Sequence, residues 1–404
     1  MVDLTLSREQ RAIQARVRTF VEDQVLPREA DALDGDHIRW PVVEELRAQA
    51  QRADLWCPHL PPAWGGMGLD TVTLAVVHEE LGVSPLGPLA LNCMAPDEGN
   101  MHALLGAGTP EQQEAYLGPL ARGEVRSCFA MTEPDVAGSD PSTLQTMATR
   151  DGDGWRLNGR KWFATGAKGA SFAIVVAVTD PEAPRHHGTT LFLVDTQASG
   201  WNLTRDVPTM GANTPGGHGE IHLEDVRVGP EAVLGEVGKG LIHAQERLGM
   251  GRITHAMRWV GQGQRALDMM VQRARTREAF GRKLKDHQAV QGYLAQAGRD
   301  LHLARLAVLD AAWRIDQGMD HRYQVSLVKQ FVAERLNSIL DDAIQVHGAL
   351  GYSRDLPLER MYRDARAARI YDGPDEVHQW VQARALLNAH SRDGTTRALT
   401  GGER

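Results

Sequence analysis

The stretch C-F-A-M-T-E-P-D-V-A-G-S-D-P-S, residues 128–142, separates two different patterns in this sequence. Before it, Ser7 and Gln10 form a candidate capping box at the start of one helix, and Thr109 with Gln112 begins another. These signals predict a helical first third of the chain.

Short runs typical of β-strands follow the stretch. F-A-I-V-V-A-V (172–178) and T-T-L-F-L-V-D (189–195) are apolar runs of strand length, and G-E-I-H-L-E-D-V-R-V (219–228) alternates. In W-R-L-N-G-R-K-W-F-A-T-G-A (155–167), the Asn-Gly pair predicts a tight turn between two strands. We therefore expect a middle β domain.

Helical periodicity returns after Gly238. Three long helical runs and a last helix that begins near Pro374 predict a four-helix bundle. The predicted fold class is α+β, with an N-terminal helical domain, a middle β-barrel-like domain and a C-terminal four-helix bundle. The expected boundaries are 1–125, 126–236 and 237–391, followed by a flexible polar tail at 392–404.

Composition narrows the class of function. The net charge of -8 over 404 residues argues against a nucleic-acid binder. Cys57, Cys93 and Cys128 lack metal or redox spacing and are expected to be buried thiols in a reducing compartment. No signal peptide and no run of about 20 apolar residues is recognisable. We expect a cytoplasmic protein without a metal and without a membrane partner.

Two segments contain residues suited to chemistry. In 128–142, small residues expose backbone N–H groups near the hydroxyls of Thr132 and Ser139, which suits a phosphate or the polar edge of a heterocycle. In R-I-Y-D-G-P-D-E-V-H-Q (369–379), Asp372 precedes Gly373 and Pro374 on a predicted turn. Taken alone, these segments favour a turn-rich connection and a helix cap or turn residue over a functional site.

Three motifs together resemble the acyl-CoA dehydrogenase family. They are T-E-P followed by G-S-D in 128–142, T-R-E-A-F-G-R-K-L-K-D-H-Q-A-V-Q at 276–291, and Q-V-H-G-A-L-G-Y-S-R-D-L-P-L-E-R-M-Y-R-D at 345–364. The first has one more residue than the usual T-E-P-x-x-G-S-D, a form similar to family members 10 and 11. The length leaves no room for the kinase-like domain that those proteins can carry.

The resemblance implies an FAD site between the β domain and the bundle. Met131 and Thr132 would contact the isoalloxazine, Ser139 would lie near the pyrophosphate, and Thr165 would bond near flavin N5. Phe163 stands where the family has a tryptophan beside the flavin. The resemblance assigns the remaining cofactor contacts, partly to the FAD of a neighbouring subunit, to Arg277, Phe280, Gln288, Gln345, Gly348, Ala349, Pro374 and Glu376.

Asp372 occupies the place of the family's catalytic glutamate. As a base it would remove the α-proton of an acyl thioester, and burial would raise its pKa. The other known location of the base corresponds to Gly251, which has no side chain. Substrate contacts are implied for Ser139, Arg252, Tyr371 and Gly373, with Arg252 on the CoA portion.

The function implied is an FAD-dependent acyl-CoA dehydrogenase, of the fatty-acid β-oxidation type, that forms a trans-2-enoyl-CoA. Electrons would pass to an electron-transfer flavoprotein, and the chain would form a homo-oligomer, a dimer or a tetramer. A same-fold oxidase acting on acyl-CoA or nitroalkanes with oxygen is an alternative. A non-catalytic flavoprotein is another.

Overall fold

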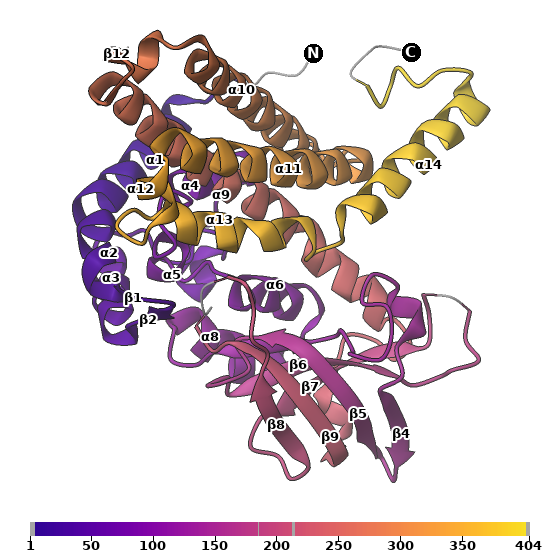
Figure 1. Ribbon diagram of the computed structural model, residues 1–404. Helices are drawn as coiled ribbons and strands as arrows, with labels where there is room; N and C mark the ends of the chain where they lie inside the picture. Colours follow the sequence, from indigo (N-terminus) through magenta and orange to yellow (C-terminus); the bar gives the residue numbers. More distant parts are fainter. Residues whose placement is uncertain (1–4, 185, 212–214, 401–404) are drawn as a thin grey trace.

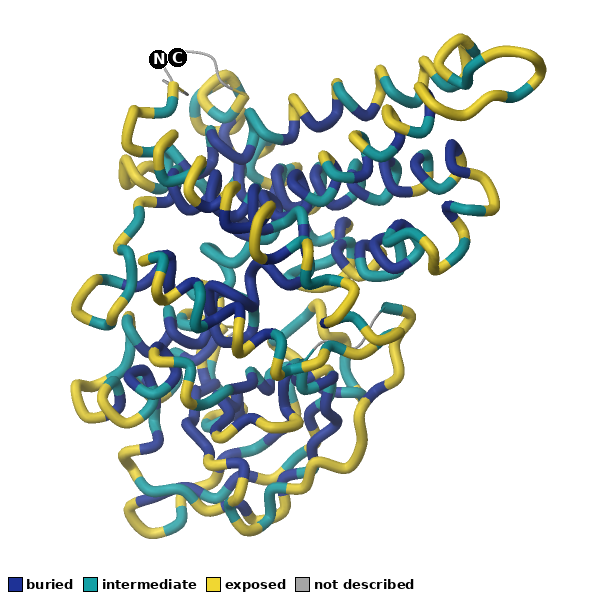
Figure 2. Tube along the Cα trace, turned by 90° about the vertical axis from the view of Figure 1, so that its left-hand side faces the viewer, coloured by how far each residue is buried: buried dark blue, intermediate teal, exposed yellow. Residues whose placement is uncertain are grey.

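The computed structural model describes residues 5–184, 186–211 and 215–400. Helices of the N-terminal region and of the C-terminal region lie together, and a β-sheet lies at one end of the molecule (Figure 1). Buried residues concentrate inside the helical and sheet regions, while the exposed ones lie on outer turns and loops (Figure 2). The α+β prediction with its helical, β and helical order is confirmed.

The N-terminal region begins with the predicted capping box. The Ser7 side chain accepts the Gln10 backbone N–H at 3.1 Å, and the Gln10 side chain accepts the Ser7 N–H at 2.9 Å. Thr109 and Gln112 also form a capping box, at the second helix start that the sequence predicted. The helices are α1 Arg8–Phe20, α2 Glu29–Ala32, α3 Trp40–Arg52, α4 Thr71–Leu81, α5 Gly87–Ala90, α6 Asp97–Ala107, α7 Pro110–Gln112 and α8 Gly118–Arg122, and a small hairpin joins β1 Leu33–Asp34 to β2 His37–Ile38.

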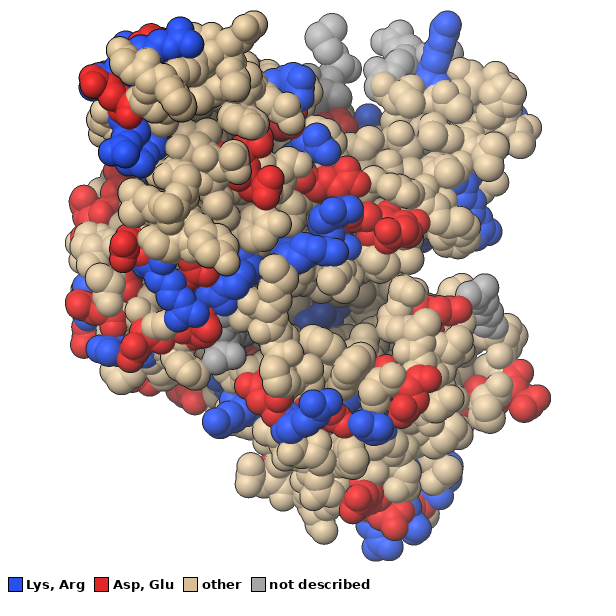
Figure 3. Space-filling view, in the orientation of Figure 1, with Lys and Arg blue, Asp and Glu red and all other residues tan. Residues whose placement is uncertain are grey.

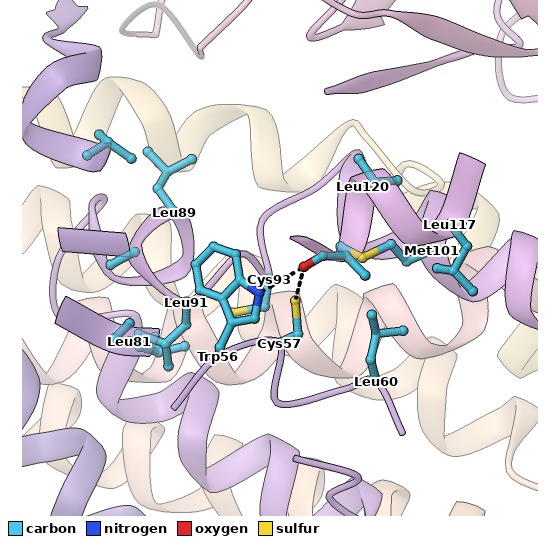
Figure 4. Packing of buried hydrophobic residues seen from close by; sticks show 14 of the residues in the cluster. Trp56, Cys57, Leu60, Leu81, Leu89, Leu91, Cys93, Met101, Leu117 and Leu120 are labelled. Carbon is cyan, nitrogen blue, oxygen red and sulfur yellow. Dashed lines mark hydrogen bonds between the residues drawn. The ribbon is translucent and has the colours of Figure 1, made fainter. Parts of the chain in front are cut away.

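The three cysteines are buried, as the sequence predicted. Figure 4 shows Cys57 beside Trp56 in the core of the N-terminal helices. The Trp56 indole N–H and the Cys57 thiol both donate to the Ala121 carbonyl, at 2.8 and 3.4 Å. These bonds satisfy polar atoms buried in the core, next to the buried polar side chains of Arg47 and Asn92.

Among the described residues, eight strands form one sheet in the order β10-β7-β6-β4-β5-β9-β8, with β3 parallel to β6. The strands are β3 Ser127–Ala130, β4 Met147–Asp151, β5 Gly154–Thr165, β6 Phe172–Val178, β7 Thr189–Asp195, β8 Trp201–Asp206, β9 His218–Val228 and β10 Val233–Leu234. All of β6 is buried because alternate residues face the N-terminal helices and the interior of the β domain.

The predicted Asn158-Gly159 turn is wrong. β5 runs without a break from Gly154 to Thr165, and its pairing with β9 only shifts register near Gly159. A Cβ on Gly159 would lie 2.5 Å from Thr146 Oγ1, so glycine is required here by close packing. The dipeptide marks a β-bulge and not a hairpin.

The C-terminal region contains the expected bundle. Its helices are α9 Gly240–Thr276, α10 Gln288–Asp316, α11 Arg322–His347, α12 Ala349–Tyr352, α13 Leu358–Arg366 and α14 Asp375–Asp393, with a hairpin of β11 Glu278–Ala279 and β12 Arg282–Lys283 after α9. α9 is one helix of 37 residues despite its internal glycines. It packs against α4, α6, α10 and α11 and reaches from the bundle to the sheet (Figure 1). Within the described residues, none of the helices is long and apolar enough to cross a membrane.

Candidate active site

Asp372 and Gly373 form a turn just before α14. Their φ angles are +54° and +99°, so the aspartate adopts a backbone conformation that favours glycine. A Cβ on Gly373 would lie 2.9 Å from Nε2 of His378. The turn places Oδ2 of Asp372 3.0 Å from Nδ1 of His255 on α9. The predicted turn is therefore confirmed, and it brings the carboxylate against the long helix.

Three side chains hold this turn by its carbonyl oxygens. Arg252 Nε donates to the Asp372 carbonyl at 3.0 Å, and Nε2 of His378 lies 3.1 Å from the same oxygen. Nζ of Lys329, on α11, donates to the Gly373 carbonyl at 2.5 Å. The turn is thus fixed from three helices, α9, α11 and α14, which restricts where the carboxylate can lie.

The electrostatics of Asp372 differ from the sequence prediction. Burial acts to raise the pKa of Asp372, but His255, Arg252 and Arg247 outweigh it and lower the pKa to about 2. Burial in turn lowers the pKa of Arg252. The expectation of a raised pKa is therefore wrong for this structure, because three basic side chains face one carboxylate. The Asp372 side chain is 19% exposed and ionised at neutral pH.

Aromatic rings form one side of the site. The Tyr371 ring lies edge-to-face against His255, with centroids 5.4 Å apart, and 6.0 Å from the ring of Trp259. Tyr371 is 38% exposed, whereas Trp259 is 6% exposed. The carboxylate thus lies next to aromatic rings that limit its exposure to water, which strengthens its interactions with nearby charges.

A second cluster lies in the β domain at the 128–142 segment. Lys161 of β5 is fully buried and forms an ion pair of 2.7 Å with Glu133. Lys161 also donates to the Met131 carbonyl at 2.9 Å, and Glu133 accepts the backbone N–H groups of Gln145 and Thr146. This buried pair fixes the backbone of residues 131–133.

Thr132 and Thr165 are half-buried at the same end of the β domain. The Thr132 hydroxyl donates to the Trp162 carbonyl at 2.7 Å, so a ligand would meet its acceptor lone pairs or compete for its proton. Thr165 Oγ1 lies 3.0 Å from Nδ1 of His218. Ser139 lies on an exposed part of the loop that follows β3.

Arg247 connects the two clusters. Its guanidinium lies over the ring of Phe129 in β3 at 4.1 Å, and its Nε donates to Asn100 of α6 at 3.0 Å. Arg247 is also one of the cations that lower the pKa of Asp372. Figure 3 shows a hollow between the helical part and the β domain, with Lys or Arg atoms visible inside it.

The sequence matches three family models, described as the N-terminal, middle and C-terminal domains of acyl-CoA dehydrogenase, over residues 7–124, 128–226 and 238–387. FadE2 of Mycobacterium tuberculosis, described as a probable acyl-CoA dehydrogenase, is 41% identical over 96% of this chain and 97% of its own length. The chain belongs to the acyl-CoA dehydrogenase family.

Two further family members are similar to the chain, one in sequence and one in structure. Acyl-CoA dehydrogenase family member 11 of mouse is 38% identical over 97% of this chain, but the chain spans only 52% of that protein. The structure of butyryl-CoA dehydrogenase from Megasphaera elsdenii matches with a TM-score of 0.85 at 28% identity, over 96% of this chain and all of that one. The family and this fold make the protein an oxidoreductase of acyl-CoA dehydrogenase type.

The other residues that the family resemblance singles out lie far from Asp372. Arg277, Phe280 and Gln288 are exposed around the β11–β12 hairpin, and Phe280 is 97% exposed. Arg277 follows Arg252 by 25 residues, which along a helix is about 38 Å. Gln345, Gly348 and Ala349 are exposed at the end of α11. Arg273 Nη2 donates to the His347 carbonyl at 3.4 Å and joins these two segments.

The structure also reveals residues that sequence reasoning missed. His255, Lys329, His378 and Arg247 all act on the Asp372 turn or its charge. A signal existed for Lys329, which interrupts the apolar face of α11 four residues after Val325. Pro374 and Glu376, in contrast, were named, and they lie at the first turn of α14.

Proposed function

We propose that this chain is an FAD-dependent acyl-CoA dehydrogenase that uses Asp372 as its base. The observation that carries the proposal is the Asp372 turn, where an aspartate has a strained backbone conformation and three side chains hold the carbonyl oxygens of the turn. Such strain persists only where the surrounding structure maintains it, and it is concentrated at functional sites.

The exposed phenylalanines support FAD as the cofactor. Phe163 and Phe280 both have φ of +51°, an unfavourable conformation for a bulky side chain, and both rings are exposed, by 42% and 97%. A flat ring system stacking on Phe163 would cover this apolar surface, as aromatic pairs do. The hydroxyls of Thr132, Ser139 and Thr165 lie in the same region and suit the polar edge of a flavin.

The distant residues support a second cofactor contact between subunits. Arg277 lies about 38 Å along α9 from Arg252, which holds the Asp372 turn. An FAD contact at Arg277 would therefore belong to a different cofactor molecule from the one beside Asp372. Arg277 is exposed, and its planar fork of donors suits the FAD pyrophosphate of a neighbouring chain, with Phe280, Gln288, Gln345, Gly348 and Ala349 around it. This proposal makes the protein a homo-oligomer.

The residues around the turn would perform the proton transfer. FAD, when bound, accepts the β-hydrogen of the substrate as a hydride. Asp372 takes the α-proton, and the Gly373 N–H is available to the thioester oxygen. Bound substrate would exclude water from the carboxylate and so raise its pKa from the low value of the free site. Arg252 donates to the Asp372 carbonyl, so we assign it to fixing the turn rather than to the CoA portion.

The test is Asp372→Asn, which keeps the shape and removes the proton acceptor. Anaerobic flavin reduction by an acyl-CoA substrate should slow by about 10²–10⁴-fold, while FAD content and acyl-CoA binding stay unchanged. Asp54, which lies after α3, is a matched control because it is also an aspartate with a positive φ, of +53°. The flavin of Asp54→Asn should be reduced by the substrate at the normal rate. A normal rate in the Asp372 variant would exclude this residue as the base.

The electron acceptor is a separate part of the proposal. An electron-transfer flavoprotein should reoxidise the reduced enzyme, and oxygen should do so slowly. Stoichiometric oxygen uptake during turnover would instead identify an oxidase with the same fold.

A further inference from the structure

Arg247 differs from Arg258 and Arg265, two other arginines of α9, because no carboxylate pairs with it. Arg258 pairs with Glu98 at 3.5 Å, and Arg265 pairs with Glu29 at 2.8 Å. Over residues 5–184, 186–211 and 215–400, no Asp or Glu forms an ion pair with Arg247. Burial lowers the pKa of the Arg247 guanidinium to about 10, which still leaves it charged at neutral pH. Asp372, Glu98 and Asp97 favour this charge without pairing with it. A guanidinium removed from water without a paired oxyanion is unfavourable, so a partner is expected.

The guanidinium of Arg247 is held in place, but not all of its N–H donors have an acceptor. Nε donates to Asn100 Oδ1 at 3.0 Å, and Nη2 donates to the Pro96 carbonyl at 3.4 Å. An arginine has five N–H donors, so three of them have no protein acceptor among the described residues. Gly99 makes room for the group, because a Cβ there would lie 2.8 Å from Arg247 Cζ. The ring of Phe129 supports it at 4.1 Å.

Open space separates this cation from the base. A Cβ added to Gly251 would meet no atom within 4 Å. Arg247, Gly251 and His255 follow one another at intervals of four residues, so they lie along one side of α9. With a rise of 1.5 Å per residue, Gly251 is about 6 Å and His255 about 12 Å from Arg247 along the axis. His255 contacts Asp372.

We propose that Arg247 determines substrate specificity by binding an anionic group, a carboxylate or a phosphate ester, carried by the acyl chain of the substrate. This inference rests on the proposed function, since it places the reacting carbons at Asp372 and the anion at Arg247. The free donors supply charge-assisted, bidentate recognition of an oxyanion. Gly251 leaves room for the acyl chain between the two ends. Without an anion, the acyl chain leaves the guanidinium desolvated and unpaired, so neutral substrates bind less well.

The experiment compares substrates of equal length on the purified flavoprotein. One pair is an acyl-CoA with a terminal carboxylate and its terminal carboxamide, and the other is an acyl-CoA with a phosphate ester on the chain and the corresponding alcohol. Anaerobic flavin reduction gives kcat/KM for each. We expect the wild-type protein to favour at least one anionic member by about 10–150-fold, the value of a charge-assisted hydrogen bond. The favoured pair identifies the oxyanion class.

Three variants separate recognition from structure. Arg247→Gln should abolish the preference, because it should lower kcat/KM far more for the anionic member than for the neutral one, mainly through KM, and Arg247→Lys should retain part of the preference. Arg265→Gln is the matched control on the same helix, because that arginine is already paired with Glu29, and it should keep the preference in full. Equal rates for neutral and anionic members in the wild-type protein would overturn the proposal. So would equal losses on both members in Arg247→Gln. If no acyl-CoA reduced the flavin, the proposed function itself would fail.

Discussion

Two fully buried lysines, Lys161 in the β domain and Lys329 in the bundle, differ in the groups that compensate their buried charge. Both have no exposed surface, and burial lowers the pKa of each to about 8. Lys161 touches its counter-ion, Glu133, at 2.7 Å. Lys329 instead donates to the neutral carbonyl of Gly373, and the anions that favour its charge are Asp372 and Asp375.

The difference indicates what each lysine stabilises. A buried charge in direct contact with its counter-ion forms a closed unit, whose loss leaves the partner uncompensated. A buried charge whose nearest partner is a backbone carbonyl fixes the position of that backbone. Lys161 should therefore contribute mainly to the stability of the folded chain. Lys329 should contribute mainly to the geometry of the Asp372 turn.

The largest expected effect is on stability, in Lys161→Met. The substitution leaves Glu133 buried at 3% exposure without its cation, which should reduce the free energy of unfolding by about 3–5 kcal/mol. Denaturant-induced unfolding followed by fluorescence measures it. The double variant Lys161→Met with Glu133→Gln removes both charges and should recover most of the loss. If the single variant lost less than about 1 kcal/mol, the contrast between the two lysines would not hold.

Lys329→Met should affect the reaction more than the fold. It leaves the Gly373 carbonyl without its donor, a loss of about 1–3 kcal/mol, or about 5–150-fold in rate if it acts entirely through the turn. We expect kcat to fall in anaerobic flavin reduction, with KM and FAD content unchanged. Lys329→Gln keeps a donor and should recover part of the rate. The contrast would fail if Lys329→Met lost as much stability as Lys161→Met while its flavin was reduced at the normal rate. Both lysines would then have a structural role.

The difference between local and long-range interactions explains how much of the site the sequence could predict. The Asp372 turn and the helical caps follow from local signals, because a few neighbouring residues determine them. The lowered pKa of Asp372 does not, because it depends on His255 and Arg252 from α9, over 100 residues away in the sequence. Gly159 shows the same limit in the fold, since Thr146 of another segment decides that the Asn-Gly pair is a bulge. Long-range packing, and not the local sequence pattern, determines both the pKa of Asp372 and the conformation at Gly159.

The smallest expected effect concerns the pH dependence of stability, and it tests whether the basic side chains around Asp372 act as the structure indicates. The pKa of Asp372 is about 2 in the folded chain and 3.8 by its ordinary value, so the unfolded chain binds more protons between these values. The ionised carboxylate therefore stabilises the fold above about pH 4, by about 2 kcal/mol, and this contribution disappears as the pH falls through about 2. Asp372→Asn removes the titration, so the difference in unfolding free energy between wild type and variant should be constant from pH 7 to 5. By pH 3 it should have shrunk by about 1 kcal/mol. A difference that grew as the pH fell would show that burial outweighs the cations and that the pKa of Asp372 is raised, as a local interpretation of the turn predicts.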